Sequence, residues 1–462
     1  MKAEFISTVG DITALCGGSL LCGDPSASIG TITTDSRDLG SRSFFVPLKG
    51  GKFDGHDFVP GLLREGRLAG FLTARRELAA AAEEAGAAAV LCDDTLASYG
   101  RMARGHRASM KATLIGITGT NGKTTTKEIL WTLLSAKYRC HKNEKNYNNE
   151  IGVPHALLGL RAEHEFSVIE MGMNHAGEIE RLSKIAAPDI ALVTSVGAGH
   201  LEFLGSVENV ARAKAEIIAG MKAGALVVVN SESPFAEIVI GLAGERRLRV
   251  LTFALEKAAD IVPDSFSIDL EGITLSYLGD EYRAPLYGLH NASNLLAAVA
   301  LARHLGVTPA EIRKALAGFT QVGMRSEIID SGCVIINDTY NSNPLSAESA
   351  LLSAARVAGN ARKIAVLSDM KELGDGAARL HRELGTKVAA AGFDMLFTWG
   401  ELAEDISRGA REAGMGGRAA HFGEKKELVA ALGKAVAKGD IVLVKGSRSM
   451  KMEEVVDALV RR

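Results

Sequence analysis

Short apolar runs alternate with longer amphipathic stretches along most of this chain. Apolar runs rich in β-branched residues occur at 113–118, 191–196 and 226–230. Runs of this length, bounded by glycine or polar residues, are typical of buried strands. The segments 123–137 and 206–218 between them have the apolar spacing of helices. Strands that alternate with helices predict a parallel sheet with helices on both faces.

The same pattern divides the chain into three predicted α/β units. Residues 1–110 mix short strands with an Ala- and Glu-rich helix, which predicts a small α/β domain. Residues 111–323 carry the parallel-sheet pattern, and strand-like alternation at 249–287 predicts an antiparallel extension of it. Residues 324–462 alternate strand and helix again, which predicts a doubly wound, Rossmann-like domain. We expect the linker, and a hinge, at 318–323.

Length and charge agree with this division and exclude some functions. The chain has 462 residues, enough for about three domains at roughly 150 residues each. Its 53 basic and 55 acidic residues leave a formal charge of −2, which argues against a general nucleic-acid binder. We find no signal-peptide pattern, no membrane span and no long coiled-coil repeat. Five cysteines without a CxxC motif favour reduced thiols. We therefore expect a cytoplasmic monomer.

The strongest chemical signal is the segment GITGTNGKTTT at residues 116–126. A predicted strand enters a glycine-rich turn, and the turn opens a helix, so backbone N–H groups and the helix dipole attract a phosphate. Lys123 is then placed for the β- and γ-phosphates and Thr124 for Mg²⁺. The general GxxxxGK[ST] pattern expects glycine where this chain has Ile117, so Gly119 and Gly122 form the turn. The alternative is a glycine-rich turn without a ligand.

Two polar side chains follow other predicted strands of the same sheet. Glu170 ends the strand at 167–170, and His200 follows the strand at 191–196. Open α/β sheets bind ligands at the carboxyl ends of their strands, and Glu170 is a candidate Mg²⁺ ligand, directly or through water. The alternatives are a solvated carboxylate and a histidine bonded to backbone. Lys214 lies in an Ala-rich helix, where composition alone favours a surface lysine.

Several separate motifs resemble those of the Mur ligases, ATP-dependent enzymes that form amide bonds in peptidoglycan assembly. The resemblance covers nearly the whole chain, and the family's own form of the phosphate loop accounts for Ile117. The matching segments are DSR at 35–37, DGHDF at 54–58, the loop at 119–125, NYNNEIGVP at 146–154, EMG at 170–172, HLEFLGSVENVARAK at 200–214, the segment 290–294, Arg325, Glu327, and DTYNSNP at 338–344.

Two segments of the third unit resemble one member of the family in particular. These are DMKELG at 369–374 and LVKGSRSMKME at 443–453. The resemblance implies a ligase that adds D-alanyl-D-alanine to UDP-N-acetylmuramoyl-tripeptide through an acyl phosphate, with ATP and Mg²⁺. The D-N-P-R type motif expected of the ligase for the preceding residue is absent from the sequence. The implied process is cell-wall biogenesis, and hence cell shape and division.

The resemblance also implies roles for individual residues. Lys214 matches a lysine that is carbamylated in several relatives and then binds magnesium. Asn294 would contact the adenine side of the nucleotide, and Arg325 and Asp338 would contact its phosphate and ribose. Lys445 would lie near the acceptor amine or the acyl group. The implied catalytic residues are Lys123, His200, Lys214 and Arg325, and the metal ligands are Thr124, Glu170, His200 and carbamylated Lys214. The implied ATP-binding residues are Gly119, Thr120, Asn121, Gly122, Lys123, Thr124, Thr125, Asn294, Arg325 and Asp338. The implied substrate-binding residues are Ser36 and Arg37 for the UDP end, Asn146 and Asn149 near the sugar and peptide, and Asn341 and Lys445.

Two other functions share part of this pattern. A folylpolyglutamate synthetase of the same superfamily has the same loop and a three-part plan, but the first unit here resembles a uridine-nucleotide binder. A nucleotide-dependent switch would bind ATP without a carboxylate substrate, and it has no need of the third-unit residues Asp338, Asn341 and Lys445. The sequence leaves open whether the third peptide residue is lysine or diaminopimelate.

Overall fold

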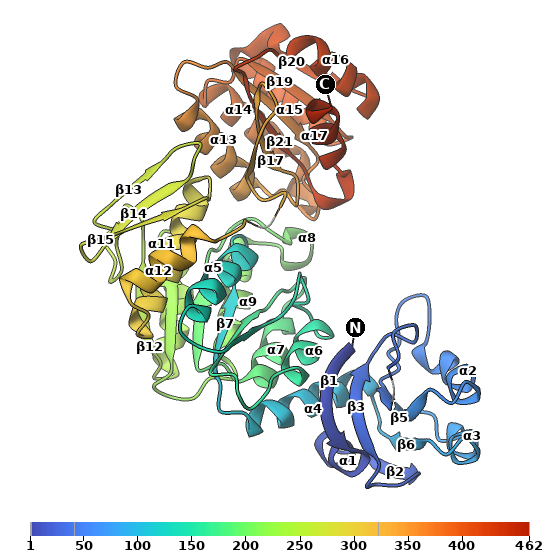
Figure 1. The fold of residues 1–462 in the computed structure, drawn as a ribbon. Coiled ribbons are helices and arrows are strands. Elements are labelled where there is room, and N and C mark those ends of the chain that lie inside the picture. The colour runs from blue at the N-terminus through green and yellow to red at the C-terminus, as the bar shows by residue number, and fades with distance from the viewer. Residues whose placement is uncertain (1, 41, 322, 462) are drawn as a thin grey trace.

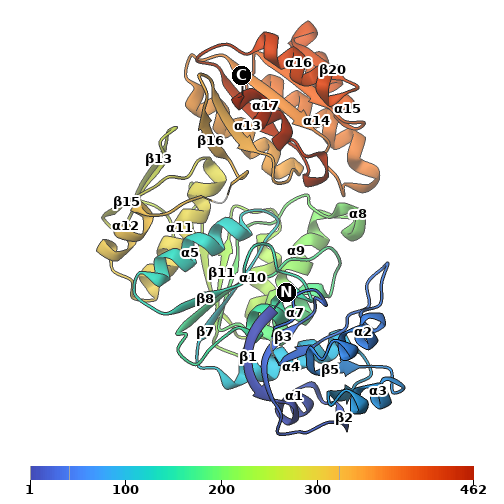
Figure 2. The ribbon, with the colours of Figure 1, turned by 45° about the vertical axis from the view of Figure 1, so that its right-hand side comes forward.

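The computed structural model describes residues 2–40, 42–321 and 323–461. Within these residues, three six-stranded sheets and one three-stranded sheet follow one another along the chain (Figure 1). The first unit and the third unit lie on opposite sides of the central unit. The turned view shows the same arrangement (Figure 2). The α/β fold class predicted from the sequence is confirmed.

The first sheet is mixed and has the order β1-β3-β4-β5-β6-β2. Strands β3 to β6 are parallel, whereas β1 and β2 pair antiparallel at the two edges. Its core contains the buried rings of Phe44 and Phe71. The elements are β1 (Lys2–Thr8), α1 (Val9–Cys16), β2 (Ser19–Cys22), β3 (Ser28–Thr33), β4 (Ser43–Phe45), α2 (Val59–Arg64), β5 (Leu68–Thr73), α3 (Leu78–Glu84), β6 (Ala88–Leu91) and α4 (Thr95–Ser109).

The central sheet is parallel throughout, with the order β12-β11-β10-β7-β9-β8. Its middle strands are buried on both faces, which explains their unbroken apolar runs. The elements are β7 (Thr113–Thr118), α5 (Lys123–Ser135), β8 (Cys140–Lys142), α6 (Gly152–Leu158), β9 (Phe166–Glu170), α7 (Glu178–Ala186), β10 (Ile190–Val193), α8 (Leu201–Leu204), α9 (Val207–Ala215), β11 (Leu226–Asn230), α10 (Ala236–Glu245) and β12 (Arg249–Phe253).

An antiparallel sheet of β13 (Ser265–Ile268), β14 (Ile273–Tyr277) and β15 (Asp280–Ala284) follows the central sheet. The predicted antiparallel segment 249–287 is therefore wrong at its start, because residues 249–253 form β12 and pair parallel with β11. Helix α11 (Leu289–His304) is buried on nearly all sides. Helix α12 (Pro309–Ala317) then ends the central unit.

The last sheet has the order β16-β17-β21-β18-β19-β20, and all its pairs are parallel except β16 with β17. Helices cover both faces, as the sequence predicts. Of the predicted linker 318–323, residue 322 lies outside the described residues. The elements are β16 (Glu327–Asp330), β17 (Val334–Asp338), α13 (Pro344–Ala358), β18 (Lys363–Ser368), α14 (Ala377–Ala390), β19 (Met395–Trp399), α15 (Ala403–Ala410), β20 (Ala419–Phe422), α16 (Lys425–Ala435), β21 (Ile441–Lys445) and α17 (Glu453–Val460).

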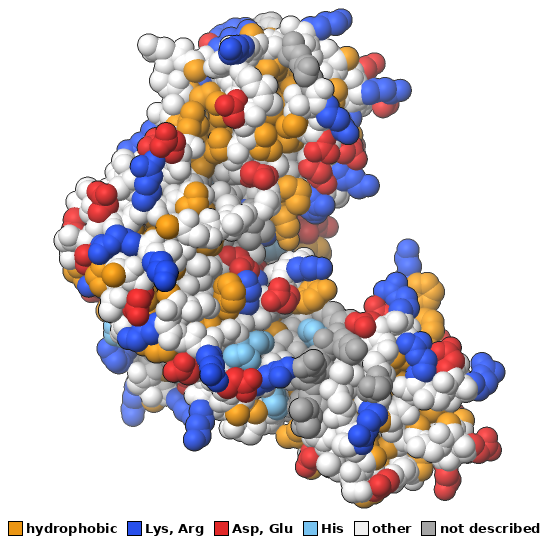
Figure 3. All heavy atoms as spheres, in the orientation of Figure 1, with side chains coloured by type: hydrophobic (Ala, Val, Ile, Leu, Met, Phe, Trp, Pro, Cys, Tyr) orange, Lys and Arg blue, Asp and Glu red, His pale blue; other side chains and the backbone are white. Residues whose placement is uncertain are grey.

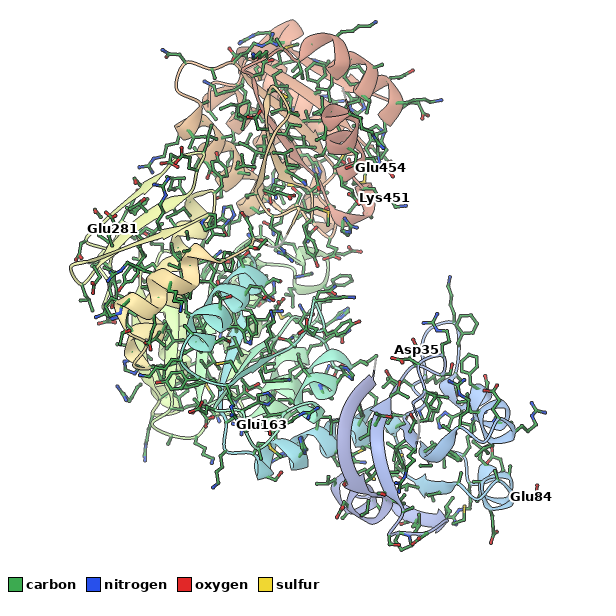
Figure 4. The ribbon with its side chains drawn as sticks, viewed as in Figure 1. Asp35, Glu84, Glu163, Glu281, Lys451 and Glu454 are labelled. Carbon is green, nitrogen blue, oxygen red and sulfur yellow. The ribbon has the colours of Figure 1, made fainter. Side chains whose placement is uncertain are left out.

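The three units surround a wide opening on one side of the molecule (Figure 3). Asp35 borders this opening from the first unit, and Lys451 lies on the third unit across from it (Figure 4). None of the helices in the described ranges combines the length and apolar character that a bilayer crossing requires.

Candidate functional site

The turn between β7 and α5 has a shape that only glycine allows at two positions. Gly119 and Gly122 have φ of +151° and +82°. A Cβ on Gly122 would lie 2.3 Å from Oδ1 of Asn294, and one on Gly119 would lie 2.0 Å from Oγ1 of Thr194. Helix α5 begins at Lys123, so its positive dipole end is at the turn, where it favours an anion.

The Lys123 side chain lies back over this turn. Its Nζ donates to the carbonyl oxygens of Gly119 at 2.8 Å and Thr120 at 3.2 Å. Burial, and then the nearby positive charge of Arg325, lower the pKa of Lys123, while Glu170 acts in the opposite direction. The ammonium is thus held at the mouth of the turn by weak backbone acceptors that a phosphate can replace.

Glu170 is a buried carboxylate directly beside the phosphate turn. Its Oε2 accepts from Oγ1 of Thr124 at 2.9 Å, and its Oε1 accepts from Nδ2 of Asn148 at 2.7 Å. The Asn143 side chain holds its backbone through bonds to both N and O of Glu170, at 2.9 and 3.0 Å. The residue is only 1% exposed, so β9 and its neighbours fix the carboxylate in place.

The oxygen atoms beside the turn suit magnesium, which does not need a full set of protein ligands. Among residues 2–40, 42–321 and 323–461, no group of three or more His, Cys, Asp or Glu side chains is placed to hold a metal ion. Mg²⁺ is commonly held by one or two carboxylates together with substrate phosphates and water. The adjacent Thr124 hydroxyl and Glu170 carboxylate, next to a phosphate turn, fit that arrangement.

Lys214 is fully buried, contrary to what composition alone favours. It lies on α9, is 0% exposed, and its Nζ has no hydrogen-bond partner within the described residues. Burial, and then the charge of Lys123, lower the pKa of Lys214 well below its usual value, with Glu216 and Glu170 opposing the change. Burial beside the phosphate turn therefore disfavours the charged form of this side chain.

His200 joins the central unit to the third unit. It has φ of +55° immediately before α8, and its Nδ1 lies 2.6 Å from Oε2 of Glu372. The backbone N–H of Glu202 donates to the carbonyl of Glu372 at 3.1 Å. The close approach of the His200 imidazole lowers the pKa of Glu372. A predicted site histidine is therefore in contact with a residue of the DMKELG segment.

Asp338 and Lys445 form a buried ion pair at the end of two neighbouring strands, β17 and β21. Lys445 Nζ lies 2.6 Å from Oδ2 of Asp338 and also donates to the carbonyl of Asn341 at 2.8 Å. The N–H of Ser326 donates to the other carboxylate oxygen of Asp338 at 3.1 Å. Lys445 is therefore held in a fixed position within the third unit.

Arg325 stacks on an aromatic ring at the start of the third unit. Its guanidinium carbon lies 3.7 Å from the centre of the Tyr340 ring. Its Nε is buried, and within the described residues it has no hydrogen-bond partner. Guanidinium groups bind phosphates through such N–H donors, so Arg325 is oriented with unused donor capacity beside the cavity.

A large cavity of about 660 Å³ lies between the central and third units. The phosphate turn and Glu170 line one side, and residues that follow β17, β18 and β21 line the other. Cationic side chains on both walls suit it to binding two anions close together, because each cation offsets part of their repulsion. The predicted site residues in its lining are Thr120, Asn121, Gly122, Lys123, Thr124, Thr125, Asn146, Glu170, His200, Arg325, Asp338, Asn341 and Lys445.

A second cavity of about 340 Å³ borders the same turn. Asn294, on α11, lines it, and its Nδ2 donates to Oδ1 of Asn291 at 3.1 Å. Asn230, Ser293 and Leu255 contribute polar and apolar surface. A mostly apolar pocket with a few amide and hydroxyl groups, beside a phosphate site, suits a nucleobase.

Three predicted substrate residues lie outside both cavities. Ser36 and Arg37 belong to the first unit, and Arg37, 88% exposed, pairs with Asp35 of its own loop at 2.8 Å. Asn149 accepts the N–H of Gly152 at 2.9 Å and so holds the start of α6. The structure brings neither group to the phosphate turn.

Other cavity residues were not singled out from the sequence. Asn148, Tyr340, Asn343 and Glu372 all line the large cavity. Each lies inside a motif recognised in the sequence, NYNNEIGVP, DTYNSNP or DMKELG. The motif was thus the available signal, but it did not show which of its side chains points inward.

Together the fold and the site define a class of protein. A strand, glycine turn and helix, a buried carboxylate, and an arginine from a second α/β domain face one cavity. This is the arrangement of a nucleotide-dependent enzyme that works between two domains.

Comparison with known families is specific. The Mur ligase middle domain model matches residues 117–302, and the Mur ligase, glutamate ligase domain model matches residues 324–448. The chain belongs to the Mur ligase family.

Curated relatives and solved structures match along nearly the full length. The UDP-N-acetylmuramoyl-tripeptide--D-alanyl-D-alanine ligase of Bacillus subtilis is 36% identical over 433 residues, 93% of each chain. A crystal structure of MurF from Acinetobacter baumannii superimposes with a TM-score of 0.89 at 29% identity, covering 100% of both chains. MurF from Thermotoga maritima in complex with ADP gives a TM-score of 0.80 at 27% identity, covering 93% of this chain and 97% of that one.

Proposed function

We propose that this chain joins D-alanyl-D-alanine to UDP-N-acetylmuramoyl-tripeptide at the expense of ATP, in peptidoglycan precursor synthesis. The observation that carries the proposal is the cavity shared by the phosphate turn and the DMKELG segment. It is supported by relatives such as the Bacillus subtilis ligase, which is named for this activity. The ADP complex of the Thermotoga maritima protein supports ATP as the nucleotide.

The first step activates a carboxylate that is otherwise unreactive toward an amine. A carboxylate oxygen of the tripeptide bonds to the γ-phosphorus of ATP, the bond to the β-phosphate oxygen breaks, and ADP leaves with an acyl phosphate remaining. Two anions must approach each other, so Lys123 and Arg325 offset their repulsion from opposite walls. The protein contributes mainly positioning and charge stabilisation here.

Thr124, Glu170 and His200 are the proposed holders of Mg²⁺. When bound, the ion neutralises phosphate charge and orients phosphate oxygens. Glu170 is pre-oriented for this by Asn148 and by the backbone bonds of Asn143. To bind the ion, His200 would have to give up its contact with Glu372.

Lys214 is proposed to add a further anion to the metal site after carbamylation. A neutral amine attacks CO₂, and loss of one proton leaves an anionic carbamate. The Nζ of Lys214 is buried without a hydrogen-bond partner in the described part of the chain, and burial lowers its pKa, which favours the neutral amine that this step needs. The positive charge of Lys123 would stabilise the resulting anion.

In the second step the dipeptide amine attacks the acyl carbon. A tetrahedral intermediate forms and collapses with loss of inorganic phosphate and of the amine proton, which leaves the amide. Asn341 and Lys445 of the third unit line the side of the cavity proposed for the acceptor. Because Lys445 is fixed by Asp338, it presents a positioned charge and not a mobile one.

The remaining substrate contacts are assigned to the opening between the units. Ser36 and Arg37 are proposed for the uridine diphosphate end, and Asn146 and Asn149 for the sugar and peptide. Asn294 is proposed for the adenine, at the second cavity. An acyl phosphate hydrolyses in water, so we propose that the third unit closes on the second about a hinge at 318–323.

The test is phosphate release with purified protein, ATP, Mg²⁺ and UDP-N-acetylmuramoyl-tripeptide, with the dipeptide varied. We expect release to depend on both peptide substrates and to match formation of a UDP-linked pentapeptide. Folate with glutamate in place of the peptides separates this activity from a folylpolyglutamate synthetase. ATP turnover that is independent of any carboxylate substrate would favour a nucleotide switch and contradict the proposal.

A further inference from the structure

A reciprocal pair of side-chain amides joins the phosphate turn to the third unit. Nδ2 of Asn343 donates to Oδ1 of Asn121 at 2.8 Å, and Nδ2 of Asn121 donates to Oδ1 of Asn343 at 3.2 Å. The two residues are 222 positions apart in the chain. Both amides use a donor and an acceptor at once, so the pair fixes the relative orientation of the two side chains as well as their distance.

On the central side, the backbone of Asn121 is already held. Its N–H donates to Oγ of Ser195 at 2.9 Å, and its carbonyl accepts from Oγ1 of Thr194 at 2.6 Å. These bonds tie the turn to the end of β10. The side chain of Asn121 therefore projects from a fixed backbone. A group bonded to this side chain is held at a fixed position relative to the phosphate turn.

On the other side, Asn343 occupies a fixed point of the third unit. It is the N-cap of α13, and its Oδ1 accepts the N–H of Ser346 at 2.9 Å. The residues just before it, from Asp338 to Asn341, carry the cavity wall and the contact to Lys445. A shift of Asn343 relative to Asn121 therefore shifts this wall relative to the phosphate turn.

Helix α13 also contacts the central unit farther along its length. Oγ of Ser353 accepts the N–H of Leu289 at 3.0 Å, and Oγ of Ser349 lies 3.2 Å from Nδ1 of His290. These contacts reach α11 and not the phosphate turn. Helix α13 is therefore held against the central unit at separate points, and the amide pair is a contact that reaches the turn itself.

We propose that Asn343 is a positioning residue for phosphoryl transfer. Through its amide pair with Asn121, it holds the wall formed by residues 338–343 in register with the phosphate turn. The inference rests on the proposed function, because the register matters only if a phosphate on the turn reacts with a group held against that wall.

The cap and the amide pair are separable by substitution. Asn343→Ser keeps a side-chain oxygen for the N-cap but removes the amide, and Asn121→Ser removes the other half. We expect each variant to lower kcat/KM for ATP in the coupled ligation about tenfold, equivalent to about 1.4 kcal/mol. The double variant should also lose about tenfold, because either change alone already breaks the pair.

A control cycle uses Ser353→Ala, which removes the contact to Leu289. Its effect should add to that of Asn121→Ser, since the two sites share no partner. Thermal unfolding midpoints check that all variants fold. If Asn343→Ser does not fold, Asn343→Asp takes its place: it retains the cap and can accept from Asn121 but cannot donate.

The outcomes separate this inference from the proposed function. Wild-type protein that makes no UDP-linked product refutes the proposed function and with it the inference. Active wild type with an Asn343→Ser variant of equal kcat/KM, or a hundredfold loss in the double variant, overturns the inference alone. A tenfold loss in all three variants supports it.

Discussion

Three lysines are almost completely buried among the side chains that the structure describes, and their surroundings give them different chemistry. Lys127 Nζ donates to the carbonyls of Asn143 and Lys145 at 2.7 and 3.0 Å, and Lys445 is paired with Asp338. Fixed partners therefore hold both side chains in place. Lys214 has no such partner within the described residues, and an unpaired buried charge is too costly to keep. Its surroundings therefore favour the neutral amine that the carbamylation proposal requires.

The carbamylation proposal predicts that Lys214→Ala loses ligase activity by about a hundredfold, because an anionic ligand is removed. Short carboxylic acids such as acetate or propionate should restore part of it by filling the space with a carboxylate. The measurement is product formation against acid concentration, because mass spectrometry can lose a labile carbamate.

Lys123→Ala is the matched control for this rescue. It removes a cation from the phosphate turn, so an added carboxylate should restore nothing there. An inactive Lys214→Ala variant that no short acid rescues would count against the carbamate, as would a variant with full activity.

At the scale of elements, the turn before α5 depends on a close approach by α11. A Cβ on Gly122 would lie 2.3 Å from the Asn294 amide oxygen, at a φ of +82°. We expect Gly122→Ala to weaken ADP binding at least tenfold, measured by calorimetric titration, because the turn must move. Gly86→Ala is the control: its φ is +67°, but nothing lies within 4 Å of the added Cβ. Equal ADP affinity in the two variants would contradict the assignment of the turn.

His141, on β8 of the central sheet, is expected to make the free energy of unfolding depend on pH. Burial, and then the charge of His164, lower the pKa of His141 from 6.5 to about 3, while its Nδ1 lies 2.9 Å from Oγ of Ser167. Between pH 6.5 and about pH 3, His141 binds a proton in the unfolded chain but not in the folded chain. The contribution of His141 is therefore fully present above pH 6.5 and is lost as pH falls toward 3.

The size of this effect is about 2 kcal/mol between pH 6.5 and 5. We expect the urea midpoint to fall over this range in the wild type and to fall less in His141→Asn, which keeps a polar group toward Ser167. The same fall in both proteins would show that His141 does not titrate on unfolding.

Sequence patterns predict the elements well where burial sets the pattern. The strands at 113–118 and 226–230 form with those bounds because they are buried on both faces. The antiparallel prediction at 249–287 went wrong at β12, because alternation shows a strand but not its neighbour. Edge strands such as β16 and β20 are short and half-exposed, so they carry little apolar signal.

At the scale of the whole molecule, the site depends on how the units sit together. The turn, Glu170 and their ligand types could be inferred locally, because a strand end and the following loop determine them. Contacts such as Asn121 with Asn343, 222 residues apart, or His200 with Glu372, depend on the placement of the third unit. No local pattern contains that information, which is why the motifs were found but not their contacts.

The arrangement of the three units bears on where each substrate of the proposed reaction would lie. In the proposed reaction the nucleotide binds the central unit at the turn, and the wall of the cavity that faces the turn belongs to the third unit. The first unit lies across the opening (Figure 3). A long substrate held at one end by the first unit can therefore place its far end in the cavity.

The central claim is that ATP activates the tripeptide carboxylate as an acyl phosphate. The most direct measurement uses UDP-N-acetylmuramoyl-tripeptide in which both oxygens of the reacting terminal carboxylate are ¹⁸O, followed by mass analysis of the released phosphate. The account predicts one ¹⁸O atom in the phosphate for each UDP-linked pentapeptide formed. Unlabelled phosphate, released in step with the same product, would contradict it.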